Sequence, residues 1–319
     1  MLEKTTLDRV HMFSELIDTN LTLEQQVAYL SQLPALSLTA QEYYHCANIC
    51  LRRSEEIMGI MHAAVDLVGT GGGRFSTFNI SIVASFIVAG AGVKIAKQVA
   101  NRAVLEALKI YPKTTPEAVT EQLYAYGLSF VCTEYFHPCL VRLQAAKEVA
   151  KTAGVLTVCH ALAPLIHPGR LSRKAIAVCH PELVGVYASV LKMQGVKRAI
   201  VFHGDGMDKL SLTGENHVAY IINGEIEQAS LSVKDTRLSP CHVEDLAGGT
   251  VQENAAVAEA ILQCRLSGPK RDIVLFNAAA AIYAGYPETI DIYDAIDLAQ
   301  ESLESGAALT CFRALQHDK

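Results

Sequence analysis

The sequence predicts an α/β fold, with a small N-terminal all-helical domain packed beside a larger domain whose mainly parallel central sheet is flanked by helices. Two observations predict this fold. Apolar residues recur at helical spacing through the first 60 residues. From residue 63 onward, short strand-like stretches alternate with amphipathic helical stretches, as in parallel sheets covered by helices. We therefore expect a helical domain at residues 1–62, with a helical contribution near 164–190, and an α/β domain at residues 63–319.

Within the helical segment, LTLEQQVAYLSQL carries apolar residues at the helical period, and Thr39 with Glu42 forms a capping box that opens the next helix. On that helix, Tyr43, Tyr44 and Leu51 are expected to be exposed. Two interpretations of these three residues stay open. They contact a second copy of the chain, or they pack against the chain's own second domain.

The α/β segment divides into elements at its turn residues. Pro116 lies at a first helical turn and Gly127 just past a helix end. Asn223-Gly224, between two alternating stretches, predicts a two-residue hairpin turn. The expected strands are 63–69, 93–97, 128–132, 174–180 and 198–204, followed by a hairpin at 217–230. The expected helices are 79–92, 115–127, 137–151, 181–195, 253–268, 271–285 and a final acidic helix.

Composition narrows the class of partner. The chain has 319 residues and a formal net charge of -6, whereas nucleic-acid-binding proteins concentrate positive charge, so we expect no nucleic-acid partner. Nine cysteines without a CxxC pair indicate reduced thiols in a cytoplasmic protein. The N-terminal stretch lacks the pattern of a secretory signal. The longest near-apolar run, Ile80 to Val93, is shorter than the roughly 20 residues that cross a bilayer, so no membrane segment is expected.

The stretch DLVGTGGGRFSTFNIS, residues 66–81, combines four glycines with short polar side chains between a predicted strand and a predicted helix. Glycine inside an element costs roughly 0.5–1 kcal/mol relative to alanine, so the cluster requires a compensating reason. Converging backbone N–H groups at a helix N-terminus bind phosphate well. The spacing matches neither the Walker loop nor GxGxxG. Phosphate binding is the favoured interpretation, and a tight structural turn is the alternative.

Several motifs in one order resemble the anthranilate phosphoribosyltransferase family across nearly the whole chain. They are GTGG, four residues, then TFNIS at 69–81; IAK at 95–97; NRAV at 101–104; LEAL at 105–108; HP at 137–138; a PL..P element at 164–168; HPELVGVYA at 180–188; HGDGMD at 203–208; and NAAAAIYAG at 277–285. The resemblance implies a helical domain beside an α/β domain shared with nucleoside phosphorylases, and a homodimer through the helical domain. It also implies transfer of phosphoribose from phosphoribosyl pyrophosphate to anthranilate, with release of pyrophosphate, in tryptophan biosynthesis.

The resemblance also implies a set of site residues, and no catalytic nucleophile is among them. Substrate-binding positions for phosphoribosyl pyrophosphate are Gly69, Thr70, Gly71, Gly72, Arg74, Thr77, Asn79 and Ser81, with Lys97 as a stabiliser of phosphate charge. Asn101 and Arg102 match the segment that wraps the substrate. His137, Lys151 and His160 fall where the family binds anthranilate. Magnesium, Mg²⁺, is expected at Asp208 and Asp205, with Ser81 from the glycine loop.

Four departures from the family's pattern stand near these positions. Gly73 replaces an aspartate, Gln98 replaces a histidine, and a Ser/Gly-rich stretch is missing after Val104. Lys209 follows Asp208 where the family has glutamate, and lysine cannot bind a hard cation that prefers oxygen. Arg74 and Lys209 could partly replace metal charge at a polyphosphate.

Three functions therefore stay open. The leading one is an anthranilate phosphoribosyltransferase, or a close relative with another small amine or ring nitrogen as acceptor. The second is a non-catalytic relative that keeps the phosphate-binding scaffold for a ligand or a protein partner. The third is a nucleoside phosphorylase of the same fold.

Overall fold

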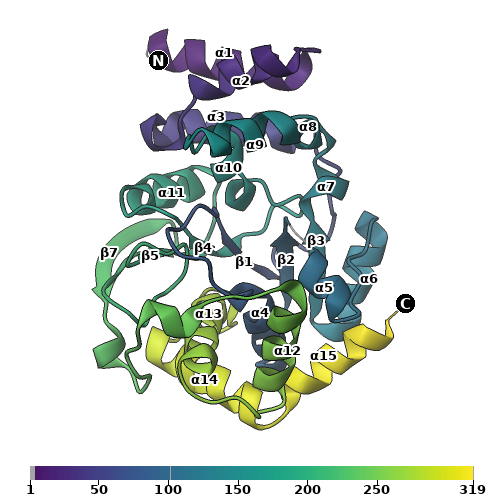
Figure 1. Ribbon diagram of the computed structural model, residues 1–319, viewed down its shortest axis with the longest axis vertical. Coiled ribbons are helices and arrows are strands. Elements are labelled where there is room, and N and C mark those ends of the chain that lie inside the picture. Colours follow the sequence, from purple (N-terminus) through teal and green to yellow (C-terminus); the bar gives the residue numbers. More distant parts are fainter. Residues whose placement is uncertain (1–3, 101, 319) are drawn as a thin grey trace.

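A computed structural model describes residues 4–100 and 102–318 of the chain. Its centre is a seven-stranded sheet in the order β3-β2-β1-β4-β5-β6-β7 (Figure 1). Neighbouring strands from β3 to β5 are parallel, and β6 and β7 continue the sheet as an antiparallel hairpin. The mainly parallel sheet is thus confirmed. The strands are β1 (Val65–Gly69), β2 (Ile95–Val99), β3 (Leu128–Cys132), β4 (Arg173–Ala177), β5 (Arg198–Gly204), β6 (Asn216–Ile222) and β7 (Glu225–Leu231).

Helices below the sheet in Figure 1 form the larger core. At its centre α13 packs against α4 and α14, and the alanine run of α13 allows this close approach because alanine adds only a methyl group. No helix among the described residues has both the length and the hydropathy to cross a membrane. The helices of this group are α4 (Ile80–Gly90), α5 (Ala103–Ala107), α12 (Val251–Leu262), α13 (Pro269–Gly285), α14 (Ile292–Glu304) and α15 (Ala307–His317). Helix α6 (Pro116–Tyr126) packs on β3, and its buried Val119 and Leu123 belong to a smaller third cluster with Val131.

A second helical layer lies above the sheet in Figure 1 and has its own apolar cluster. Residues 138–161 join it, because α9 packs on α2, so the proposed helical domain takes helices from two stretches of the chain. The layer contains α1 (Lys4–Asp18), α2 (Leu23–Ser31), α3 (Ala40–Leu51), α8 (Pro138–Val141), α9 (Gln144–Thr152), α10 (Val158–Ala161) and α11 (Glu182–Met193), with α7 (Thr133–Phe136) leading to it.

The Thr39–Glu42 capping box opens α3 as predicted, with both reciprocal hydrogen bonds formed. The expected exposure of Tyr43 and Leu51 is wrong, since both are buried. The Tyr43 ring lies 5.4 Å from the ring of Tyr187 on α11, and α11 itself packs on β5 and β6. Of the two interpretations, packing within the chain therefore holds for this face of α3.

The single helix predicted at 137–151 is interrupted. The chain turns at Arg142 and Leu143 between α8 and α9. Leu143 is fully buried, and the Arg142 guanidinium donates a hydrogen bond to the Ile17 carbonyl at the end of α1. Tertiary packing of these two residues overrides the local helical pattern.

Turn chemistry follows the sequence closely. Asn223 and Gly224 have φ of 51° and 85°, as a type I′ hairpin turn requires. Gly127 ends α6 in the left-handed region with φ of 75°, and Pro116 is the first residue of that helix. These three local predictions are confirmed.

Gly90 at the end of α4 provides a test of this packing. A β-carbon there would lie 2.3 Å from Ser302 Oγ and 2.5 Å from the Ala308 backbone nitrogen. We expect Gly90→Ala to lower the free energy of unfolding by about 1–3 kcal/mol, the usual range for overpacking. Denaturant unfolding measures this change.

The matched control is Gly185→Ala in α11, where only the movable Gln228 side chain comes near, at 3.2 Å. Because alanine favours the helix by up to about 1 kcal/mol over glycine, this variant should be as stable as the native chain or more stable. Equal losses in both variants would contradict the described contact between α4, α14 and α15.

Candidate functional site

The glycine loop leaves the carboxyl end of β1 and enters α4. Gly71 and Gly72 have φ of 69° and 80°, a region that favours glycine, so these two glycines are required by the path of the chain. Asn79 is the N-cap of α4, and its side chain makes no capping hydrogen bond. The loop therefore presents backbone N–H groups and short polar side chains at a helix N-terminus, where anions are stabilised.

Three contacts fix the ends of this loop. The Thr70 backbone donates to the Ala177 carbonyl at 2.9 Å, and the Thr70 hydroxyl accepts from the Cys179 backbone at 3.0 Å. Thr77 forms an antiparallel bridge with Ala247. The Thr70 hydroxyl thus joins β1 to the segment after β4.

The segment after β5 closes over the middle of the loop. The Gly71 backbone donates to Asp208 Oδ2 at 3.0 Å, and Lys209 Nζ lies 2.7 Å from Asp208 Oδ1. The Arg74 backbone donates to the Gly206 carbonyl at 2.9 Å. A β-carbon on Gly73 would approach Asp208 Oδ1 to 3.1 Å, so glycine at 73 leaves room for the Asp208 carboxylate.

Lys97, predicted to reach the phosphates, lies in the sheet below the loop. Its side chain is 3% exposed. Its ammonium donates to the carbonyls of Leu67 at 2.5 Å and Gln98 at 3.1 Å. Burial lowers the pKa of Lys97 to about 8, and the nearby Asp66 carboxylate opposes that shift. In this conformation the Lys97 ammonium bonds backbone carbonyls of β1 and β2, and it supplies positive charge to the loop from the sheet.

A buried polar network surrounds Asp66 in β1. The Gln98 backbone and side-chain amide both donate to Asp66, each at 3.0 Å, and the same Gln98 amide donates to the Ala163 carbonyl at 2.9 Å. Lys174 in β4 donates to the Pro164 carbonyl at 3.2 Å, and burial lowers the pKa of Lys174 to about 8. His167 is hydrogen-bonded to the Ala96 carbonyl through Nε2 at 2.9 Å.

Sequence reasoning missed Asp66, Lys174 and His167. A signal was present for the first two, because a charged residue inside an otherwise apolar predicted strand is buried and needs a partner.

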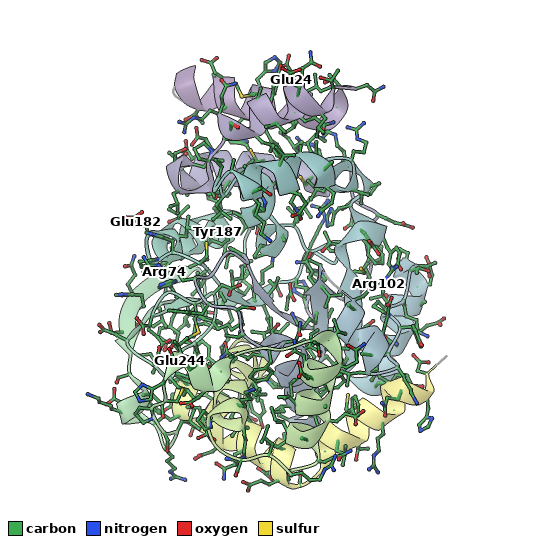
Figure 2. All side chains as sticks on the ribbon, viewed as in Figure 1. Glu24, Arg74, Arg102, Glu182, Tyr187 and Glu244 are labelled. Atoms are coloured by element: carbon green, nitrogen blue, oxygen red, sulfur yellow. The ribbon has the colours of Figure 1, made fainter. Side chains whose placement is uncertain are left out.

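Arg102 is engaged away from the glycine loop. It pairs with Glu106 at 2.7 Å and with Glu134, and its guanidinium lies 5.7 Å from the centre of the Tyr135 ring. Figure 2 shows Arg74 and Arg102 on opposite sides of the molecule. Asn101 lies outside the described residues.

The three predicted acceptor residues have different surroundings. His137 is fully buried. His160 accepts a hydrogen bond from the Thr157 backbone at 3.1 Å, and burial lowers the pKa of His160. Lys151 is exposed in the last turn of α9. The residues next to the loop are instead Leu156 and Cys179, whose side chains lie 3.2 and 3.8 Å from a β-carbon placed on Gly72.

Two of the expected magnesium ligands, Asp208 and Asp205, are engaged with other groups in this conformation. Asp208 is held by the Lys209 ammonium and the Gly71 amide. Asp205 accepts from the Thr213 hydroxyl at 2.7 Å. Over residues 4–100 and 102–318, no group of three His, Cys, Asp or Glu side chains is placed to hold a metal ion. Because lysine and not a carboxylate follows Asp208, the described residues do not build an all-protein cage for a divalent cation, and Mg²⁺ here would need oxygens of the substrate and of water as well.

Comparison with known proteins extends the similarity beyond the loop. Residues 61–309 match the glycosyl transferase family, a/b domain. An anthranilate phosphoribosyltransferase from Desulfitobacterium hafniense is 38% identical over 261 residues, 79% of this chain and 76% of that protein. One from Moorella thermoacetica is 35% identical over 305 residues, 92% of this chain and 88% of that protein. The chain belongs to the anthranilate phosphoribosyltransferase family.

Solved structures of the family agree with this fold. The enzyme from Thermus thermophilus matches with a TM-score of 0.87 at 28% identity, covering 99% of this chain and 95% of that one. The Saccharomyces cerevisiae enzyme in complex with phosphoribosyl pyrophosphate and Mg matches with a TM-score of 0.83 at 23% identity, covering 99% and 92%. The helical layer and the sheet are therefore those of an anthranilate phosphoribosyltransferase.

His137 gives this family member a testable pH dependence. Burial lowers the pKa of His137 from 6.5 to about 4. Between these values the unfolded chain binds a proton that the folded chain does not, so acidification from pH 6.5 to 4 destabilises the fold, by on the order of 3 kcal/mol for this group. His137→Leu should reduce the loss of unfolding free energy over this range, measured by denaturant titration at several pH values.

The control is Leu140→Ala, which removes buried apolar volume next to His137 and changes no titratable group. This variant should lose stability by a similar amount at every pH and keep the slope of the native chain. If both variants show the native slope, His137 is protonated in the folded protein and its assignment as a buried neutral group is wrong.

Proposed function

We propose that this chain transfers phosphoribose from phosphoribosyl pyrophosphate to anthranilate and releases pyrophosphate, a step in tryptophan biosynthesis. The observation that carries the proposal is the glycine loop at the start of α4, within a chain similar over most of its length to proteins named for this activity. The family is one of transferases. Residues 61–309, which match the glycosyl transferase family, include every substrate-binding residue that we propose.

The donor site is proposed at the glycine loop. Backbone groups there receive the pyrophosphate and ribose phosphate, and Lys97 contributes positive charge from below. We assign the donor to Gly69, Thr70, Gly71, Gly72, Arg74, Thr77, Asn79 and Ser81. We also propose Asn101 and Arg102 as donor-binding residues. Arg102 can bind the donor only if its ion pairs with Glu106 and Glu134 break.

The chemistry requires orientation and charge stabilisation. The anthranilate nitrogen attacks the anomeric carbon, the C–N bond forms, and the C–O bond to pyrophosphate breaks with its electron pair leaving on pyrophosphate. The nitrogen, positively charged after the attack, then loses one proton to solvent water. Because the transition state resembles an oxocarbenium ion, the protein mainly holds two substrates in line and stabilises the departing anion. No covalent enzyme intermediate is needed.

The acceptor side is proposed to include His137, His160 and Lys151. Lysine can pair with the anthranilate carboxylate, although without the two-point geometry of arginine. The Saccharomyces cerevisiae structures include a complex with 4-fluoroanthranilate, and a similar small aromatic amine is the acceptor class proposed here. We propose that Mg²⁺ is bound by the pyrophosphate group of the donor as its counter-ion. We further propose a cytoplasmic homodimer formed through the helical layer.

A non-catalytic ligand-binding role is the second candidate. It is favoured by the Asp208 carboxylate on the Gly71 amide and by the two carboxylates that engage Arg102. The double variant Gly73→Asp with Lys209→Glu separates the two candidates. A gain of activity from an inactive native chain supports the second candidate, and a loss from an active one supports the transferase.

The direct test is whether the purified chain forms phosphoribosyl-anthranilate. The reaction is monitored by the loss of anthranilate fluorescence. Thr77→Val removes one hydroxyl from the proposed donor site. We expect its KM for phosphoribosyl pyrophosphate to rise by about 10–100-fold, because one hydrogen bond to a charged group contributes roughly 1.5–3 kcal/mol.

Thr120→Val is the matched control, since the Thr120 hydroxyl bonds only the Pro116 carbonyl within α6 among the contacts described. It should keep the native KM. A native chain that neither forms the product nor binds either substrate would overturn the proposed function.

A further inference from the structure

The Asp208 carboxylate occupies the place of an anion on the glycine loop. One of its oxygens accepts from the Gly71 amide at 3.0 Å, and the other lies 2.7 Å from the Lys209 ammonium. The Asp208 and Lys209 side chains are 13% and 19% exposed. A backbone amide in a glycine loop together with a cation is the donor set that phosphate oxygens use. The chain therefore supplies a carboxylate at a position suited to phosphate.

The loop leaves space for this carboxylate. A β-carbon on Gly69 would lie 2.6 Å from Asp208 Oδ2, and one on Gly73 would lie 3.1 Å from Asp208 Oδ1. Larger side chains at either position would push Asp208 off the Gly71 amide. Glycines on both sides of the carboxylate therefore belong to the same arrangement as the Asp208–Lys209 pair.

Two further cations, Lys97 and Arg74, lie near this pair, together with the Asp66 carboxylate beside Lys97 and Asp205 in the Asp208 segment. Lys97 lies close enough that Lys209 and Asp208 influence the Lys97 pKa in opposite directions. The Arg74 side chain passes 3.3 Å from a β-carbon placed on Gly206, in the segment that carries Asp208. A pyrophosphate carries more charge and more acceptor oxygens than one carboxylate, so it is the stronger partner for these cations.

We propose that pyrophosphate displaces Asp208 from the Gly71 amide and pairs with Lys209, so that the chain binds phosphoribosyl pyrophosphate without a divalent ion held by its own side chains. This inference rests on the proposed function and adds how the donor is held. Lys209 is then a substrate-binding residue, and Asp208 is an internal competitor of the substrate. A metal-ligand role for Asp208 makes the opposite forecast, because removing a ligand charge weakens the binding of a metal complex.

Titration calorimetry with phosphoribosyl pyrophosphate tests the inference, in EDTA and in magnesium. The native chain should bind in EDTA with a Kd within about 3-fold of its value in magnesium. Lys209→Gln should weaken binding in EDTA by about 10–100-fold, the range for one charge-assisted hydrogen bond. Lys209→Glu should bind only when magnesium is present. Asp208→Asn should bind more tightly than the native chain in EDTA.

The charge-matched control is Lys197→Glu. Lys197 is exposed and precedes β5, so a whole strand separates it from the segment of Lys209. Its binding in EDTA should equal that of the native chain, and thermal unfolding of each variant verifies that it is folded.

The two proposals fail in different ways. Binding by the native chain that requires magnesium, and is weakened by Asp208→Asn, would overturn the role of Lys209 while leaving the transferase proposal intact. Absence of binding by the folded native chain and by Asp208→Asn, with and without magnesium, would remove the donor site itself and both proposals with it.

Discussion

The buried Asp66 carboxylate is the interaction on which the alignment of the sheet and the glycine loop depends. Asp66 is fully buried in β1 and receives two hydrogen bonds from Gln98 of β2. It also opposes the pKa depression that burial causes at Lys97 and at Lys174. Removing one partner of a buried charge cluster costs about 3–5 kcal/mol because the remaining charges stay desolvated. Three adjacent strands are therefore held by one carboxylate, three residues before the loop begins.

Beyond that point the loop is held by segments distant in sequence. Thr70 is bonded to the segment after β4, Gly71 to Asp208 after β5, and Thr77 to Ala247 before α12. A loop fixed at three places is preorganised. Preorganised amides stabilise a bound anion without the free-energy cost of reorienting their dipoles. The glycines allow the close approach that this arrangement needs.

The parts predicted from the sequence are those that depend on local chemistry. The strand alternation, the Thr39 capping box, the Asn223-Gly224 turn and the glycine loop each follow from neighbouring residues. The missed parts depend on tertiary contacts. Tyr43 is buried against Tyr187 of α11, and the helix at 137–151 is interrupted where Leu143 is buried and Arg142 reaches the end of α1. Asp208 and Lys209 are adjacent in the sequence, but the contact of Asp208 with Gly71 forms only where the segment after β5 meets the glycine loop.

The same distinction separates the proposed donor side of the site from the proposed acceptor side. The proposed donor loop presents mainly backbone N–H groups, which any sequence supplies once the glycines permit the path. Recognition of an acceptor depends on individual side chains, and here His137 is fully buried while His160 is hydrogen-bonded to the Thr157 backbone. A side chain used in one set of contacts cannot serve another without breaking the first. Substitution therefore changes acceptor recognition first, while an anion site built from backbone persists in the same fold.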